Sequence, residues 1–221
     1  MLMSSDRHFT KDFIDARQDF NLFLDEITKY FPKSEIIITE DCVNKKNLDI
    51  LDSYCGIDAI MKIPNGFRGL AVRVQWSKAY DTFTIRYLRI NSKEETEYQK
   101  RLKSIKVDGC IYPYITIQAY LEQKNNPKSI LSLGIVKTKS LYEFVKNRVC
   151  HDDIMEWYYS ADRKTKISFA GFDVGVSSDN KGDVIFLAIP FKELLLSLGN
   201  DFIWEKNKEQ IKNLAIQNIL T

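Results

Sequence analysis

The stretch of sequence that decides the fold is GIDAIMKIPNGFRGLAVRVQW, which runs from residue 56 to residue 76. Apolar residues dominate 56–63 and 70–76, and Pro64-Asn65-Gly66 lies between them. Asn-Gly between two apolar runs is the strongest short-range signal for a β-hairpin, because both residues tolerate the positive φ of a type I′ turn. The segment at 80–88 predicts a third strand. We therefore expect an antiparallel meander of three strands.

The position of the turn decides which residues of the hairpin face each other. If Asn65 and Gly66 are the two loop residues, Asp58 lies directly across from Arg73, with both side chains on one face of the sheet. Two interpretations follow. In the first, the two residues form a cross-strand ion pair that stabilises the hairpin by about 0.2–1 kcal/mol if it is exposed. In the second, they serve a binding or catalytic site.

Periodicity and turn signals predict the elements on either side of this hairpin. Helices are expected at 10–31, 92–105 (opened by a capping box at Ser92), 140–149, 190–199 and 202–220, and strands at 36–39, 111–121, 130–136, 166–174 and 183–189. The result is an α+β chain with a central mixed or antiparallel sheet flanked by helices. We expect residues 1–150 to form the core and residues 151–221 to pack on it as a hairpin-plus-helices extension.

The composition is that of an ordinary globular protein. Of 221 residues, 44% are hydrophobic and 28% are charged, and the net charge of +2 argues against a uniformly basic, histone-like binder. The four cysteines are far from any C-x-x-C spacing, and there are only two histidines, so a structural zinc site is not expected. No apolar run approaches the ~18 residues of a membrane span, and the N-terminal segment does not read as a signal peptide. We expect a reduced, cytoplasmic protein that does not contact a membrane.

The charge is concentrated in one part of the chain. Between Lys62 and Lys106 there are 11 basic residues and four acidic ones, interleaved with aromatic side chains such as Trp76, Tyr80 and Tyr87. A basic surface that carries planar groups suits a phosphate backbone. The alternative is a solvated surface of mixed charge above some buried tyrosines. The asymmetry makes nucleic acid the leading candidate partner.

One segment is similar to a known enzyme superfamily. Residues 52–59, DSYCGIDA, followed by Val72-Arg73-Val74-Gln75, resemble the PD-(D/E)XK nucleases, which include restriction-endonuclease-like and Mrr-like members. The resemblance covers roughly residues 10–121. In that superfamily a Gly-Ile-Asp-like segment supplies one metal-binding carboxylate, and the next strand supplies an acid or Gln followed two residues later by a Lys. Here Asp58 fits the carboxylate, whereas Arg73 stands in place of the acid and Gln75 in place of the Lys.

The resemblance implies a Mg²⁺-dependent site for phosphodiester hydrolysis, which needs hard oxygen ligands and a cation near the scissile phosphate. Asp58 is the implied principal ligand, with Asp52 or Glu26 as a further carboxylate. Gln75 is then an accessory ligand or positions the water, and Lys78 completes the catalytic set. The implied nucleic-acid contacts are Arg73, Arg86, Tyr98, Gln99 and Lys103.

Two functions remain open from the sequence. The first is a metal-dependent nucleic-acid-acting enzyme, endonuclease-like and of prokaryotic or phage type. The second is a non-catalytic module that binds nucleic acid or protein on a degenerate nuclease-like fold, because Arg73 would repel a divalent cation unless a further carboxylate offset it. A protein partner or a homodimer is compatible with either function.

Overall fold

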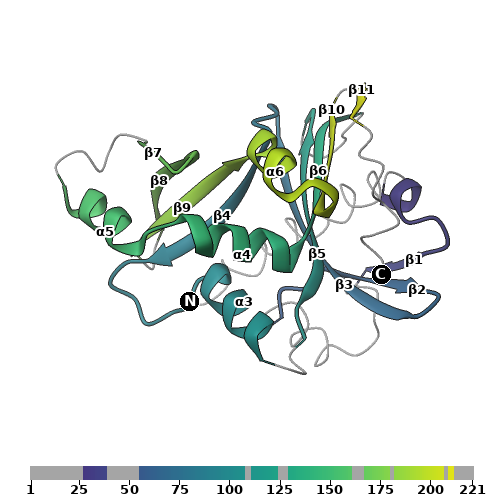
Figure 1. Cartoon of the computed structure of the whole chain (residues 1–221), viewed down its shortest axis with the longest axis horizontal. Helices are drawn as coiled ribbons and strands as arrows, with labels where there is room; N and C mark the ends of the chain where they lie inside the picture. Colours follow the sequence, from purple (N-terminus) through teal and green to yellow (C-terminus); the bar gives the residue numbers. More distant parts are fainter. Residues whose placement is uncertain are drawn as a thin grey trace, which may run out of the picture.

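The structure is a computed structural model, and it describes residues 27–38, 55–107, 111–123, 129–160, 167–179, 182–206 and 209–211. Of the helix expected at 10–31, only the end is described, and residues 27–30 are helical. The fold is α+β, with two sheets flanked by helices (Figure 1). None of the helices in the described part of the chain combines the length and the apolar character that a membrane crossing requires.

The larger sheet has seven strands and is mixed, as expected for the central sheet. Across the sheet its strands are β1 (Glu35–Ile38), β2 (Ala59–Ile63), β3 (Gly66–Trp76), β5 (Pro113–Leu121), β6 (Ile130–Lys137), β10 (Phe202–Lys206) and β11 (Glu209–Ile211). Strands β3 and β5 are parallel, and the other neighbours are antiparallel. The hairpin over residues 56–76 is confirmed as β2 and β3.

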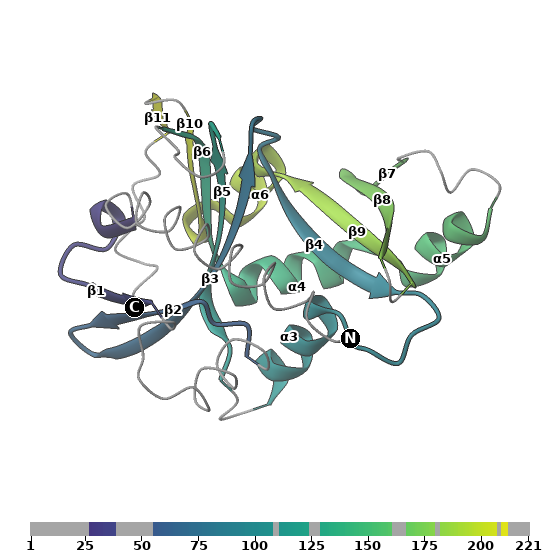
Figure 2. The same ribbon diagram turned by 180° about the vertical axis from the view of Figure 1, so that it is seen from behind.

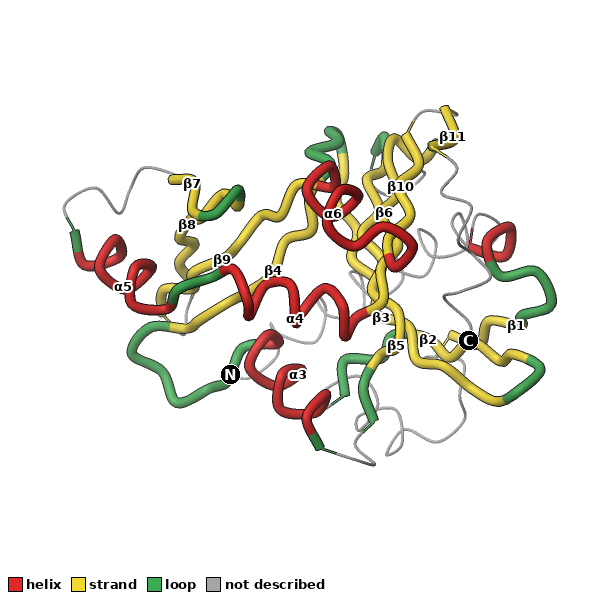
Figure 3. Tube along the Cα trace, viewed as in Figure 1, coloured by secondary structure: helices red, strands yellow, loops and turns green. Residues whose placement is uncertain are grey.

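The expected meander is wrong in its third strand. Strand β4 (Thr82–Arg89) does not pair with β3 but lies at the edge of a second, antiparallel sheet of order β4-β9-β8-β7. The chain leaves the first sheet between Ser77 and Asp81, both of which have positive φ, at 75° and 51°. Because β5 occupies the edge of β3 beyond the hairpin, β4 pairs with β9 instead. Figure 3 shows the strands in these two groups.

The second sheet consists of β4, β9 (Gly182–Pro190), β8 (Phe172–Asp179) and β7 (Ile167–Phe169). The late hairpin is therefore present, but its arms are 172–179 and 182–190 rather than 166–174 and 183–189. Strand β9 pairs with β4, and β10 pairs with β6, so residues from the expected C-terminal extension enter both sheets. The division of the chain at residue 150 stays a prediction.

Helix α3 (Glu97–Lys106) begins later than the capping box at Ser92 predicted. The capping box that forms is Thr96 with Gln99: the Thr96 hydroxyl accepts from the Gln99 N–H, and the Gln99 side chain accepts from the Thr96 N–H. Thr96 also donates its hydroxyl to the Tyr87 carbonyl at 2.9 Å, which ties the start of the helix to β4. The Ser92 hydroxyl instead accepts from the Glu94 N–H within a turn.

Three further helices complete the described fold: α4 (Thr138–Arg148), α5 (His151–Tyr159) and α6 (Phe191–Leu198). The helix expected at 202–220 is wrong over its first residues, which form β10. Phe202 and Ile203 are both buried, on opposite faces of the sheet, and a strand beside β6 allows this alternation. Residues 212–221 lie outside the described part of the chain.

Two hydrophobic cores hold the sheets in place. One packs against a face of the larger sheet and includes Ile27 and Phe31. The other lies between the two sheets and helices α3 to α6, with Tyr120 and Phe191 among its largest buried side chains. Figures 1 and 2 show α3 and α4 on the same side of β4 and β9, and no described helix covers their opposite side.

Candidate functional site

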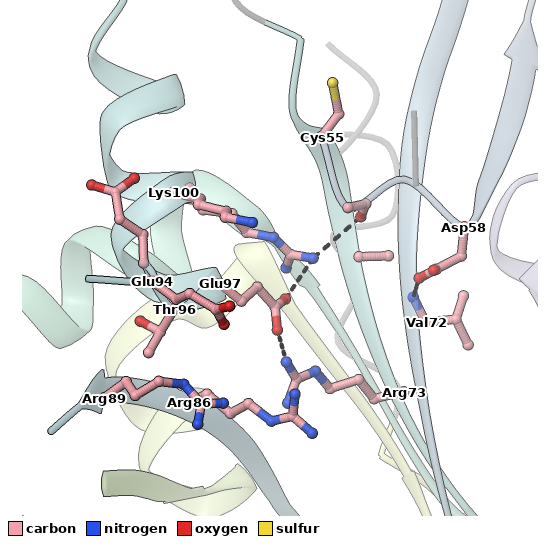
Figure 4. A pocket seen from close by; sticks show the side chains of 14 residues that line it. Cys55, Asp58, Val72, Arg73, Arg86, Arg89, Glu94, Thr96, Glu97 and Lys100 are labelled. Carbon is pink, nitrogen blue, oxygen red and sulfur yellow. Dashed lines mark hydrogen bonds and ion pairs between the residues drawn. The ribbon is translucent and has the colours of Figure 1, made fainter. Parts of the chain in front are cut away.

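A cavity of about 430 Å³ lies where the two sheets meet the start of α3. Its wall is formed by the approach to β2, the middle of β3, the end of β4 and the first turn of α3 (Figure 4). We call it the arginine pocket, because Arg73 of β3, Arg86 of β4 and Arg101 of α3 enter it around the carboxylate of Glu97. These residues come from two sheets and a helix, so only the folded chain brings them together.

Glu97 is shared between two guanidinium groups. It pairs with Arg73 through one carboxylate oxygen and with Arg101 through the other, the second contact being 2.5 Å long. Glu97 and Arg101 are four residues apart on α3, which places both side chains on one face of the helix. Arg101 is almost fully buried and also donates to the Gly56 carbonyl and to the Tyr142 hydroxyl, each at 3.2 Å.

Arg73 is held in the wall of the pocket by the neighbouring sheet. Its guanidinium donates to the Thr84 carbonyl of β4 at 2.7 Å, in addition to its pair with Glu97. Desolvation lowers the pKa of the Arg73 guanidinium to about 10, and the charges of Arg101 and Arg86 act in the same direction. Arg73 is therefore still a cation at neutral pH, in a place where cations are in excess.

Arg86 differs from its neighbours. Among the described residues it has no ion-pair partner, and Figure 4 shows its side chain reaching toward that of Arg73 from the opposite sheet. Lys100, one turn along α3, also lines the pocket without an ion pair within the described part of the chain. The pocket thus presents cationic groups whose charge the surrounding carboxylates do not fully match.

Asp58 lies in this pocket, but not opposite Arg73. In the observed register Ile63 pairs with Gly66, so Pro64 and Asn65 are the loop residues. Proline fixes a negative φ at the first turn position, which excludes the expected type I′ turn, and Gly66 takes the positive φ of 134°. The register moves by two residues, so Ala59, the first residue of β2, pairs with Leu70, and Arg73 lies beyond the part of β3 that pairs with β2. The prediction of a directly opposed Asp58–Arg73 pair is wrong for this reason.

Asp58 lies just before β2 begins, and there it continues the hydrogen bonding to β3. The Asp58 N–H donates to the Leu70 carbonyl at 2.8 Å, and one Asp58 carboxylate oxygen accepts from the Val72 N–H at 2.6 Å. This second contact is drawn in Figure 4. Asp58 is therefore fixed at the rim of the arginine pocket by the backbone of the adjacent strand.

Gln75 and Lys78 are not in the arginine pocket. Gln75 faces a second cavity, of about 670 Å³, between β3 and β5 on one side and β4, β8 and β9 on the other. We call it the inter-sheet cavity, and Arg73 and Arg86 line both cavities. Lys78 lies beyond the end of β3, with its ammonium 5.2 Å from the ring centroid of Tyr80. The positive φ of Ser77 ends the strand before Lys78 can share a face with Asp58.

The three predicted contacts on α3 have different surroundings. Tyr98 is a core residue, whose ring stacks on Tyr142 with centroids 5.6 Å apart, and burial raises the pKa of its hydroxyl. Its prediction as a nucleic-acid contact is wrong, because the helix presents this side to the core. Gln99 is occupied by the cap of the helix. Lys103 is exposed and pairs with Glu95.

The described residues contain no cluster of metal-ligating side chains. No group of three or more His, Cys, Asp or Glu side chains is close enough together in the described ranges to hold a metal ion. Glu97 is neutralised by Arg73 and Arg101, and Arg73 occupies the position where a second acid was expected. The further predicted ligands Asp52 and Glu26 lie outside the described residues.

Sequence reasoning missed Glu97 and Arg101. The available signal was their spacing of four residues, which is that of a helical ion pair. That spacing does not reveal that Arg101 is buried or that Arg73 joins the pair from another element. In comparisons with protein-family models, curated proteins and solved structures, nothing matched this chain.

Proposed function

We propose that this protein binds nucleic acid by taking a backbone phosphate into the arginine pocket. One observation carries the proposal: Arg73 and Arg86 converge from two sheets, and among the described residues Arg86 has no carboxylate partner. The planar guanidinium matches the oxygens of a phosphate and can bind two of them at once. A phosphate would supply the negative charge that this pocket lacks.

The fold supports a nuclease-like origin for this site. The described helical turn at 27–30, the hairpin of β2 and β3, helix α3 and strand β5 follow the order expected from the resemblance to PD-(D/E)XK nucleases, whereas β4, between β3 and α3, joins the second sheet and departs from it. Asp58 lies immediately before β2, where that resemblance puts a carboxylate. We propose a restriction-endonuclease-like fold that binds nucleic acid at the position of the nuclease cleft.

Binding without cleavage is the function that the described residues support best. Arg73 occupies the place of an acidic ligand, and neither Gln75 nor Lys78 lines the pocket. Metal-dependent cleavage is the second candidate function, and the observation in its favour is that Asp58 lines the same pocket as the phosphate contacts. Mg²⁺ is commonly held by one or two carboxylates together with water and substrate phosphate oxygens, and Asp58 would be one of these carboxylates.

The binding function is tested by comparing two variants that lose the same charge. Arg86→Gln removes the unpaired guanidinium, whereas Lys62→Gln removes a cation paired with Glu35 on the exposed surface of β2. With a fluorescein-labelled single-stranded DNA decamer, we expect Arg86→Gln to weaken binding by roughly tenfold. Lys62→Gln should change it by less than about twofold. Equal effects of the two variants would contradict the proposal.

The two candidate functions are separated by incubating the protein with Mg²⁺ or Mn²⁺ and plasmid, single-stranded DNA or RNA. Asp58→Asn is the informative variant, because its amide oxygen can still accept from the Val72 N–H. We expect binding and no cleavage in both proteins. Cleavage by the wild type that Asp58→Asn abolishes would establish the second candidate instead.

A further inference from the structure

The inter-sheet cavity is lined by a buried side-chain amide that has no hydrogen-bond partner in the described part of the chain. Gln118, in the middle of β5, is fully buried and lines the cavity. Neither its Nε2 nor its Oε1 has a hydrogen-bond partner among the described residues. Leaving a buried amide unpaired costs free energy, and most such groups in folded proteins are satisfied. The amide of Gln118 therefore keeps a donor and an acceptor behind the wall of the cavity, and a ligand reaches them once the side chains that cover them move aside.

The opposite wall of the cavity is suited to a flat ring. It is formed by the face of the second sheet that carries Thr84, Phe186 and Ala188, where Phe186 pairs with Arg86 of β4 on one side and with Gly175 of β8 on the other. A Cβ on Gly175 would come within 2.4 Å of the Phe186 ring, so the ring lies directly over this glycine. Only a glycine permits this approach. Phe186 is partly exposed and offers an aromatic surface to the cavity.

The cavity and the arginine pocket are joined by their shared residues. Arg73 and Arg86 line both. Arg73 is also the residue of β3 directly beside Gln118 of β5, as their register shows. A ligand that places a phosphate on the two arginines can therefore extend into the inter-sheet cavity toward Gln118 without crossing another element.

We propose that the inter-sheet cavity binds an unpaired nucleobase, which stacks on Phe186 and presents one edge to the Gln118 amide while its phosphate lies on Arg73 and Arg86. A glutamine amide pairs with an edge that carries an adjacent donor and acceptor, as adenine does. Aromatic side chains stack bases from single strands. This inference rests on the proposed function, since the arginines hold the phosphate to which the base is attached.

Two sources supply such a ligand: a free nucleotide or an unpaired residue of a single strand. The test uses a fluorescein-labelled deoxyadenosine decamer and a decamer of the same length that carries only abasic sugar-phosphate units. We expect the wild type to bind the deoxyadenosine decamer about tenfold more tightly than the abasic one. Competition by adenosine monophosphate distinguishes the sources: displacement at comparable concentration assigns a free nucleotide, and displacement only by the decamer assigns a strand.

Two variants show which residues read the base. Gln118→Leu removes both polar atoms with little change in volume, and Phe186→Ala removes the stacking ring. Each should lower the affinity for the deoxyadenosine decamer to that for the abasic decamer and leave the abasic affinity unchanged. Arg86→Gln, in contrast, should weaken both. Gln118→Leu and Phe186→Ala alter different walls of the cavity, so a folding defect in one variant leaves the other informative. Circular dichroism shows whether either variant has such a defect.

The outcomes separate the two proposals. If the wild type binds both decamers equally tightly, or if Gln118→Leu and Phe186→Ala leave the preference intact, the nucleobase site is wrong and phosphate binding stands. If neither decamer binds, the proposed function fails, and the nucleobase site fails with it.

Discussion

The arginine pocket and the inter-sheet cavity share two residues, Arg73 and Arg86, yet the central carboxylate of the first is paired and the buried amide of the second has no partner among the described residues. In the arginine pocket, Glu97 neutralises two guanidinium groups, and the contacts hold α3 against β3. In the inter-sheet cavity, the Gln118 amide has no partner among the described residues. A polar group with internal partners supports the fold, whereas a buried one without them lowers stability until a ligand pairs with it. Glu97 and Arg101 therefore hold the fold together, whereas Arg86 and the Gln118 amide lack such partners among the described residues.

The largest effect is expected from Glu97→Gln. Removing this charge leaves Arg73 and Arg101 facing each other with no carboxylate between them, so we expect a loss of about 2–3 kcal/mol in the free energy of unfolding. The same change should strengthen phosphate binding several-fold, because the Glu97 carboxylate no longer competes with the phosphate for the Arg73 guanidinium. Urea denaturation and decamer binding measure the two effects.

The matched control is Glu143→Gln on α4. Glu143 forms an exposed ion pair with Lys139, also four residues away on a helix, with a separation of 4.0 Å. Its loss should cost less than about 0.5 kcal/mol. Similar costs for the two glutamates would show that Glu97 is an ordinary surface residue and would remove the contrast between the two cavities.

A second comparison uses two neighbours on the same face of β5. The Thr116 hydroxyl shares a 2.8 Å hydrogen bond with Thr138 and accepts from Arg101, so Thr116→Val should destabilise the protein by about 1–3 kcal/mol. Gln118→Leu removes an amide without partners and should raise stability by about 1 kcal/mol. Thermal unfolding of both variants shows whether each substitution lowers or raises the stability of the protein. A clear loss of stability in Gln118→Leu would mean that the amide has an internal partner.

A smaller effect concerns Tyr98, which lies in the core and not on the binding surface. Burial raises the pKa of its hydroxyl, so in the folded protein Tyr98 keeps its proton at pH values where the unfolded chain releases it. The folded state then binds more protons, and stability falls as the pH rises above about 10. Tyr98→Phe should make this fall less steep, whereas Tyr159→Phe, at a ring that is 69% exposed, should not. Equal slopes for wild type and Tyr98→Phe would mean that the Tyr98 hydroxyl is exposed to solvent.

The smallest effect is expected from Lys103→Gln. Lys103 was predicted to contact the nucleic-acid backbone, but it is exposed and paired with Glu95 at the rim of the arginine pocket. Its loss should change decamer affinity by less than about twofold and stability by less than about 0.5 kcal/mol. A reduction in affinity as large as that of Arg86→Gln would extend the binding surface along α3.

The sequence predicted those elements whose signals are local. The turn between β2 and β3, the strands at β5 and β6 and the helix at α6 follow from proline, asparagine and glycine positions and from hydrophobic alternation. The partner of β4 was not predictable, because strand periodicity does not say which edge a strand will join. The segment after 202 has apolar residues that fit either a helix or a strand, and pairing with β6 decided the outcome over 202–206.

The candidate site, too, was predictable only where its signals are local in the sequence. Asp58, Arg73 and Arg86 were identified from a local motif and from the basic stretch, and the structure brings all three to one pocket. The roles of Glu97 and Gln118 depend on contacts between elements far apart in the sequence, which no spacing records. A shift of two residues in the hairpin register was enough to move Arg73 out of the position opposite Asp58.

The most direct test of the central claim is the salt dependence of decamer binding. If the arginine pocket holds a phosphate, the logarithm of the dissociation constant of the wild type should rise steeply between about 50 and 200 mM salt. Binding releases counterions from the phosphates, and added salt opposes that release. Arg86→Gln should reduce this slope by about one, and Lys62→Gln should leave it unchanged. A flat salt response of the wild type, or the same slope in Arg86→Gln as in the wild type, would contradict phosphate binding in this pocket.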